Sequence, residues 1–134
     1  MSNKISNKIY LGWNDIEELV DNLCYQIKLN YPEISYVHGL KRGGLIPAVM
    51  ISHTMGLKFV DTPEFYDNCL IVDDICDSGA TLKKWSGYDT AVLHHKPDTS
   101  CYTPSIHAVI HEGNGWIIYP WERDDSESIQ DYLK

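Results

Sequence analysis

One stretch of the sequence decides the fold: LIVDDICDSGATL, residues 70–82. The apolar run at residues 69–72 predicts a buried strand, and a helix-sized segment, residues 80–85, follows a loop of small residues. Backbone N–H groups in this loop can converge on one phosphate, because the dipole of the following helix favours negative charge at its N-terminus. The loop therefore predicts an anion-binding site made by Asp77, Ser78, Gly79, Ala80 and Thr81.

Helix and strand patterns alternate along most of the chain. Asn14 followed by Glu17 is typical of an N-cap and its capping-box partner, and predicts a helix over residues 15–29. A second helix is predicted over residues 45–55, where Gly56 ends it. This alternation, with further strands expected at residues 34–37, 58–60 and 91–94, predicts an α/β fold: a mostly parallel twisted sheet flanked by helices, in one domain over residues 1–134.

The two ends of the chain follow other patterns. Residues 2–9 consist of the tetrapeptide SNKI repeated twice and predict a loose arm. Strand-like runs at residues 107–110 and 116–119, separated by turn residues 112–115, predict a small C-terminal hairpin. Residues 124–134 place two apolar side chains four residues apart, which predicts a short surface helix.

Composition and charge restrict the function classes. The chain has 134 residues, with 11 basic and 19 acidic side chains and a formal net charge of -8. This charge repels polyanions, so we expect no binding to nucleic acid and none to a membrane. No apolar run approaches the roughly 20 residues of a membrane-spanning helix, and the four cysteines form no CxxC pair. We expect a cytoplasmic protein with reduced thiols and no zinc site.

Two adjacent acids, Asp73 and Asp74, precede the anion-binding loop. The glycine patterns of dinucleotide and nucleoside-triphosphate loops are absent from the sequence. The two carboxylates can accept hydrogen bonds from the hydroxyls of a ribose whose 5′-phosphate occupies the loop, and can hold water on a Mg2+ ion attached to the same sugar. Two other interpretations stay open: an acidic surface turn, and the strand-end acid pair of an unrelated doubly wound fold.

The same segment resembles the 5-phosphoribosyl 1-diphosphate (PRPP) motif of the type I phosphoribosyltransferases. That motif reads as two hydrophobic residues, Asp-Asp, any two residues, Asp, Ser or Thr, Gly, any residue and Thr, and residues 71–81 match it. The resemblance implies the type I phosphoribosyltransferase fold with a small C-terminal hood. It also implies an enzyme that uses PRPP and Mg2+, in which Asp73, Asp74 and Asp77 are the catalytic acids and the first two reach the metal through water.

A second loop, GLKRGG at residues 39–44, leads from a predicted strand into a predicted helix. Lys41 and Arg42 supply positive charge, and Gly43 and Gly44 expose backbone N–H groups, a combination that suits a departing diphosphate. In the family the matching loop binds pyrophosphate and often contains a non-proline cis peptide, which the resemblance puts at the bond between Lys41 and Arg42. Taken alone, the loop is better interpreted as an ordinary glycine-rich turn with solvated basic residues, and its pairing with the acid motif favours the diphosphate.

The C-terminal third resembles the purine pocket of the bacterial xanthine-guanine phosphoribosyltransferases. On this resemblance Lys96 donates to the 6-oxo group of the base, the ring of Trp116 stacks on the base, and the backbone of Ile117 meets its 2-position edge. Asp77 faces N7. A cation beside the 6-position favours a 6-oxopurine (guanine, xanthine or hypoxanthine), since adenine carries an amino donor there. Each residue alone has a plainer interpretation, as a solvated lysine or a packed tryptophan.

Other residues of this region have weaker or no assignments. Glu122 lies near the position where relatives carry an acid for a second Mg2+, and this is a weak prediction. No role is assigned to His94, His95, Tyr119 and Trp121, the last two being packing residues or part of a lid.

The chain departs from the family at residues 61–68, where members place a long flexible loop that closes over PRPP. A shortened loop weakens the exclusion of water. A non-catalytic PRPP- or nucleotide-binding regulatory module therefore remains an alternative to the purine-salvage enzyme, and a pyrimidine or other base remains an alternative acceptor. By analogy with relatives, we expect a homo-oligomer, a dimer or tetramer.

Overall fold

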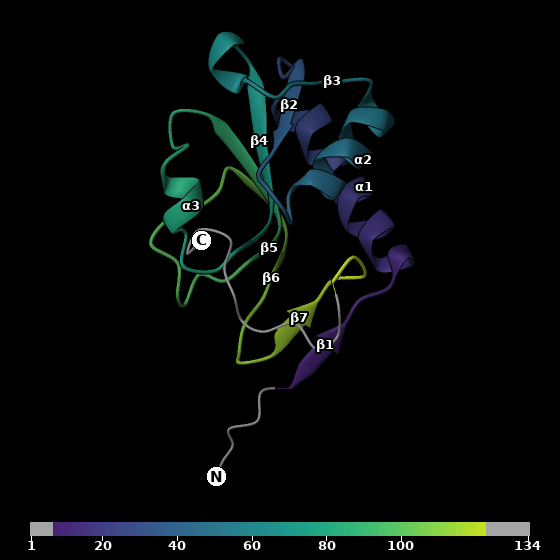
Figure 1. Cartoon of the computed structure of the whole chain (residues 1–134), viewed down its shortest axis with the longest axis vertical. Coiled ribbons are helices and arrows are strands. Elements are labelled where there is room, and N and C mark those ends of the chain that lie inside the picture. Colours follow the sequence, from purple (N-terminus) through teal and green to yellow (C-terminus); the bar gives the residue numbers. More distant parts are fainter. Residues whose placement is uncertain (1–6, 123–134) are drawn as a thin grey trace.

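The computed structural model describes residues 7–122 and contains a five-stranded parallel sheet in the order β3-β2-β4-β5-β6 (Figure 1). Helices α1 and α2 lie side by side on one face of this sheet, and α3 lies on the other. The predicted α/β fold with a parallel sheet flanked by helices is confirmed. The sheet comprises β2 (Tyr36–Gly39), β3 (Lys58–Phe59), β4 (Cys69–Cys76), β5 (Asp89–His95) and β6 (Ile106–Ile110).

Helix α1 (Trp13–Asn30) begins two residues earlier than predicted. Gly12 is the N-cap, and Asp15 Oδ2 accepts a hydrogen bond from Gly12 N at 2.7 Å. The predicted Asn14 cap with Glu17 as its partner is therefore wrong, because Asp15 satisfies the first free amide. The buried side chains of α1 recur at helical spacing and pack against the sheet: Ile16, Val20, Leu23, Cys24 and Ile27.

The two loops that follow β2 and β4 begin helices. Helix α2 (Leu45–Met55) has the predicted bounds and ends at Gly56, which adopts the left-handed conformation with φ 72°. Helix α3 (Ala80–Lys83) is shorter than predicted, and its N-cap is Gly79. The carboxyl ends of parallel strands meet at one edge of a sheet, so both loops lie at the same edge.

Strand β4 extends four residues beyond its predicted end at residue 72. Asp73 pairs with Val92 of β5, and Cys76 pairs with His95, so the ladder continues past the acids. The acid pair, Asp73 and Asp74, thus belongs to the central strand rather than to a loop. Its backbone is held by the sheet on the β5 side.

The predicted C-terminal hairpin is wrong. Strand β7 (Trp116–Ile118) pairs in parallel with β1 (Lys8–Tyr10), and together they form a separate two-stranded sheet. After β6, His111 N still donates to His95 O at 2.8 Å, so the chain leaves along β5 before it turns towards β1. The loose-arm prediction is wrong for residues 8 and 9, which belong to β1, and the predicted helix at residues 124–134 lies outside the described residues.

Candidate functional site

The glycine loop, residues 39–44, packs directly on the acid pair. Leu40 N donates to Val72 O at 2.9 Å, which fixes the start of the loop against β4. A Cβ atom added to Gly43 would overlap the Asp74 carboxylate, and one added to Gly44 would overlap Val72 O. Only glycine allows this close approach at the two positions. The peptide bond between Lys41 and Arg42 is cis, as the family resemblance predicted.

The acid pair is held by hydrogen bonds from the backbone. Asp73 Oδ1 accepts from Asp74 N at 2.9 Å, and Asp74 Oδ1 accepts from Ile75 N at 2.8 Å. The pKa of Asp74 is raised from 3.8 to about 6, first by burial and less strongly by the nearby Glu122 carboxylate, while hydrogen bonds with Asp73 and Ile75 oppose the rise. This site therefore concentrates acidic groups that a cation or hydroxyl donors would stabilise.

The anion loop, residues 77–81, presents amides with no protein acceptor. Gly79 has φ 84°, and Ala80 N donates to Ser78 Oγ at 3.2 Å. Within residues 7–122, the backbone N–H groups of Ser78, Gly79 and Thr81 donate no hydrogen bond to a protein acceptor. The loop is also fixed by a hydrogen bond, in which Cys101 N donates to Ser78 O at 2.7 Å. Free amides at the start of a helix are suited to an anion.

Asp77 and Lys96, which the family resemblance assigns to N7 and the 6-oxo group of one base, lie together. Lys96 Nζ is 3.7 Å from Asp77 Oδ1, and Lys96 N donates to Cys76 O at 2.9 Å. Thr99 Oγ1 donates to the same Asp77 Oδ1 at 2.7 Å and lies 3.1 Å from Asp77 O. Thr99 thus orients Asp77. The sequence analysis missed Thr99, because nothing in the pattern of its loop distinguishes it from a surface residue.

Trp116 and Ile117 lie on β7, apart from this pair. Within the described residues no interaction joins Trp116 to Lys96 or to Asp77. Trp116 N donates to Asn7 O at 2.7 Å, and Ile118 O accepts from Leu11 N at 3.0 Å. Alternate residues of a parallel strand face the partner strand, so the main-chain groups of Ile117 face the other edge of β7. Among the strands of residues 7–122, none pairs with that edge of β7.

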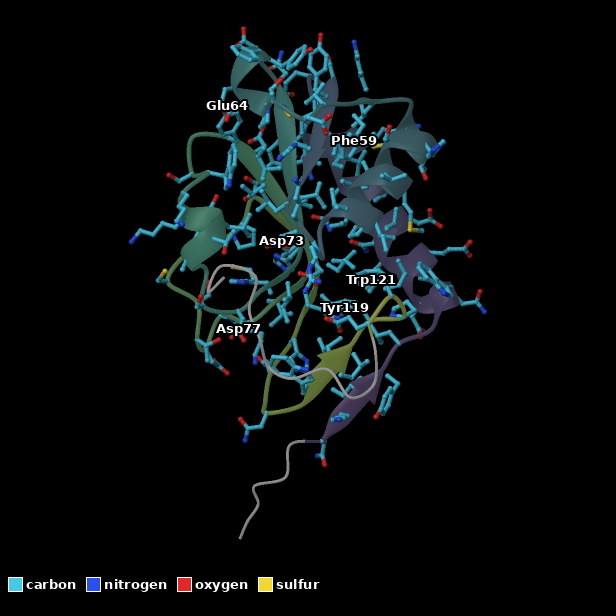
Figure 2. All side chains as sticks on the ribbon, in the orientation of Figure 1. Phe59, Glu64, Asp73, Asp77, Tyr119 and Trp121 are labelled. Atoms are coloured by element: carbon cyan, nitrogen blue, oxygen red, sulfur yellow. The ribbon has the colours of Figure 1, made fainter. Side chains whose placement is uncertain are left out.

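An aromatic cluster joins the end of β7 to the acid pair (Figure 2). Tyr119 Oη donates to Asp74 O at 3.2 Å and lies 2.8 Å from His94 Nδ1. The rings of Tyr119 and Trp121 stack at 4.9 Å between centroids. Glu122 Oε1 accepts from Tyr119 N at 2.9 Å, which holds this weakly predicted acid near Asp74. The sequence left His94, Tyr119 and Trp121 without roles, and their proximity to the site is the new finding.

The shortened segment, residues 61–68, runs back towards the start of β4. It contains a 3-10 turn, η1 (Pro63–Phe65), and Tyr66 packs on Tyr36 at 4.5 Å between ring centroids. Ser35 N donates to Asn68 O at 3.0 Å, which closes the segment beside the first residues of β2. In Figure 2 Glu64 lies near the top of the view, above both Asp73 and Asp77. The segment does not reach over the acid pair.

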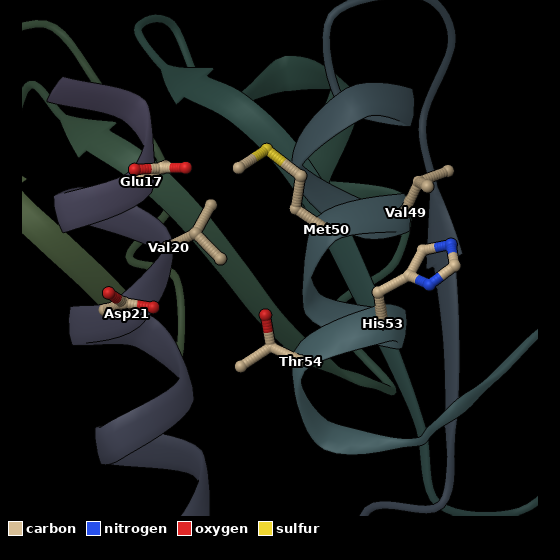
Figure 3. A pocket seen from close by; sticks show the side chains of 7 residues that line it. All are labelled: Glu17, Val20, Asp21, Val49, Met50, His53 and Thr54. Atoms are coloured by element: carbon tan, nitrogen blue, oxygen red, sulfur yellow. The ribbon is translucent and has the colours of Figure 1, made fainter. Parts of the chain in front are cut away.

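Other candidate sites do not coincide with these residues. A groove of about 390 Å³ between α1 and α2 is lined in part by Glu17, Met50 and His53 (Figure 3), and contains none of the predicted site residues. Within residues 7–122, no group of three or more His, Cys, Asp or Glu side chains is arranged to hold a metal ion. The four cysteines are not in disulfides. None of the helices in this range has the length and apolar character needed to cross a membrane.

Comparisons with known proteins agree with this geometry. The xanthine-guanine phosphoribosyltransferase of Cereibacter sphaeroides is 25% identical to this chain over 146 residues, which cover 84% of the chain and 86% of the relative. The structure of a purine phosphoribosyltransferase from Pyrococcus horikoshii matches with a TM-score of 0.72 and 25% identity, covering 91% of this chain and 99% of that one. No protein-family model matches the chain.

A further structure, the xanthine-guanine-hypoxanthine phosphoribosyltransferase of Helicobacter pylori, matches with a TM-score of 0.73, covering 88% of this chain and 95% of that one. Its identity is 19%, so this match supports the fold alone. The sheet and its two loops define an α/β protein with the phosphoribosyltransferase fold. The resemblance to the type I phosphoribosyltransferases drawn from residues 70–82 is confirmed, because the relatives that this chain is similar to in sequence and in fold are phosphoribosyltransferases, which are enzymes.

Proposed function

We propose that this protein is a purine phosphoribosyltransferase that transfers the 5-phosphoribosyl group of PRPP to a 6-oxopurine and releases pyrophosphate. The relatives named above act on purines, and two of them carry xanthine and guanine in their names. The proposal rests mainly on one observation: the glycine loop is packed against Asp74 at Gly43. The glycine loop, proposed to bind the leaving diphosphate, and Asp74, proposed to bind the ribose, are therefore adjacent.

The anion loop supports the assignment of the 5′-phosphate. Its unpartnered amides at Ser78, Gly79 and Thr81 suit a phosphate, with the hydroxyls of Ser78 and Thr81 as further donors. The acid pair follows the apolar part of β4, three residues before the loop begins at Asp77 and Ser78. A ribose with its phosphate in the loop then has its hydroxyls directed at Asp73 and Asp74.

The pair of Lys96 and Asp77 supports a 6-oxopurine as the acceptor. N7 and the 6-oxo oxygen lie on the same edge of such a base, and a neighbouring cation and carboxylate match them. N9 of the base attacks C1 of the sugar, the bond from C1 to the diphosphate oxygen breaks, and Asp77 receives the proton from N7. Lys41 and Arg42 stabilise the charge that grows on the leaving group.

The acid pair also fits a divalent cation. Asp73 and Asp74 offer hard carboxylate oxygens, and the pKa of Asp74 is raised first by burial and then by the Glu122 carboxylate, so a cation beside Asp74 would stabilise its charged form. We propose that Asp73 and Asp74 hold Mg2+ through water, and that Glu122 contributes to a second Mg2+. The metal, when bound, neutralises charge on the diphosphate. A cytoplasmic location and a homo-oligomer remain predictions from the sequence.

A non-catalytic PRPP- or nucleotide-binding module is the second candidate, and the path of residues 61–68 favours it. This segment packs on Tyr36 and accepts a hydrogen bond from Ser35 N, away from the acid pair, so it does not exclude water from the activated sugar. The Lys96 and Asp77 pair argues for the enzyme instead, since a sensor of ribose phosphate needs no purine contacts.

A spectrophotometric assay with PRPP and Mg2+ separates the two candidates. Guanine, xanthine, hypoxanthine, adenine and uracil are each offered, and consumption of the base and release of pyrophosphate are measured together. Consumption of one of the first three bases supports the proposal. Binding of PRPP in calorimetry without consumption of any base contradicts it and supports the binding module.

A further inference from the structure

The Tyr119 hydroxyl contacts two neighbouring strands of the main sheet. It donates to the main-chain oxygen of Asp74 on β4 at 3.2 Å, and it lies 2.8 Å from Nδ1 of His94 on β5. Tyr119 and His94 are only 2% and 6% exposed, so neither contact competes with bulk water. In the sheet His94 pairs with Ile75, the residue that follows Asp74.

The hydrogens of this chain of contacts can be assigned. A phenol hydroxyl has one hydrogen and a carbonyl oxygen can only accept, so the Tyr119 hydroxyl donates its hydrogen to Asp74 O. His94 Nδ1 must then carry the hydrogen of the neutral imidazole and donate it to the phenol oxygen. Burial and the nearby His111 lower the pKa of His94 to about 4, so this imidazole is neutral near pH 7.

Tyr119 is also fixed from its own segment. It follows β7, the strand that carries Trp116 and Ile117, by a single residue. Its amide donates to Glu122 Oε1 at 2.9 Å, and its ring stacks on Trp121 with an interplanar angle of 2°. A displacement of Tyr119 would therefore move the end of β7 with it.

We propose that Tyr119, oriented by His94, is a positioning residue that sets β7 against Asp74 and so aligns the base with the ribose. This inference rests on the proposed function, in which β7 holds the base and the acid pair holds the sugar. The attacking N9 and C1 lie at the junction of these two parts, where a misplacement of about 1 Å can cost 100-fold in rate.

Three variants and a control test the inference in the full chain. Tyr119→Phe keeps the ring stacked on Trp121 and removes only the hydroxyl. His94→Leu removes the donor, whereas His94→Asn retains an amide that can donate from about the place of Nδ1. Tyr25→Phe, on the surface of α1 and 64% exposed, is the matched control.

We expect kcat for the purine to fall about tenfold in Tyr119→Phe and in His94→Leu, with KM for PRPP within twofold of wild type. The double variant should fall no further, because both residues act through one chain of hydrogen bonds. His94→Asn should recover most of the rate. A role in stability alone would lower the melting temperature of Tyr119→Phe and leave kcat unchanged, which would overturn the inference.

Nuclear magnetic resonance gives a readout that does not depend on activity. In wild type the 15N shifts of His94 should identify the Nδ1–H tautomer. In Tyr119→Phe, but not in Tyr25→Phe, the Trp116 indole and Ile117 amide signals should shift. Absence of transfer in wild type would refute the proposed function alone, while unmoved Trp116 and Ile117 signals in Tyr119→Phe would refute the positioning role.

Discussion

Substitution of Gly43 by alanine tests whether the glycine loop and the acid pair work as one site. The added methyl group would overlap Oδ2 of Asp74 and lie 2.9 Å from Oδ1. Either the Asp74 side chain rotates or residues 39–44 move away from β4. Gly87 is the matched control, since a Cβ atom there meets nothing within 4 Å.

The cost of Gly43→Ala follows from the contacts that must change. Rotation of Asp74 sacrifices the hydrogen bond from Ile75 N at 2.8 Å, and a hydrogen bond to a charged group contributes about 1.5–3 kcal/mol. Alanine returns about 0.4–1 kcal/mol by restricting the unfolded chain. We expect a net loss of about 1–2 kcal/mol in the free energy of unfolding, which lowers the melting temperature by several degrees.

The effect on activity should exceed the effect on stability. If Asp74 moves by about 1 Å, kcat/KM for PRPP should fall about 100-fold, because the carboxylate no longer meets the ribose and its metal. Pyrophosphate release is measured at 25 °C, with circular dichroism to verify folding, for Gly43→Ala and Gly87→Ala in parallel. If Gly43→Ala keeps a kcat/KM within twofold of Gly87→Ala, the acid pair and the glycine loop are not one site.

Three further substitutions test other parts of the structure. Lys96→Met should raise KM for the 6-oxopurine at least tenfold and leave KM for PRPP nearly unchanged, because one charged hydrogen bond to the base is lost. The control is Lys84→Met, at an exposed position. If Lys96→Met and Lys84→Met have equal KM values for the base in steady-state assays, the assignment of Lys96 is contradicted. Asp74→Asn should remove a pH dependence of stability. Burial raises the pKa of Asp74 from 3.8 to about 6, so the folded wild type binds more protons than the unfolded chain between these values, and its free energy of unfolding should fall as pH rises from about 4 to 6 and then level off. Urea titrations over this range compare the two proteins, and an identical slope in Asp74→Asn would refute the shift. Asp15→Ala should destabilise the protein by about 1 kcal/mol through loss of the hydrogen bond to Gly12 N, whereas Asn14→Ala should change stability by less than about half as much; a chemical denaturation series with the reverse order would show that Asn14 is the cap.

Short-range signals made much of this fold and site predictable. The helix over residues 45–55 has the predicted bounds, because Gly56 supplies a left-handed end that few other residues tolerate. The anion loop could be recognised because a strand, small residues and a helix start are consecutive in the chain. The pairing of Asp77 with Lys96 could be predicted only from the family resemblance. The two residues, 3.7 Å apart, directly follow β4 and β5, which are distant in the sequence.

Partner choice among strands could not be predicted in the same way. The run at residues 116–119 and the turn before it carry the local pattern of a hairpin, and local pattern does not specify which strand supplies the ladder. The pairing of Trp116 with Lys8 joins residues more than 100 positions apart, and the acid pair extends the ladder of β4 only because β5 continues beside it to His95. The contact between Tyr119 and Asp74 depends on both of these pairings at once. Tyr119 connects two separate sheets, and such a connection leaves no periodic pattern in the sequence. Its role therefore follows only from the contacts that its side chain makes at Asp74.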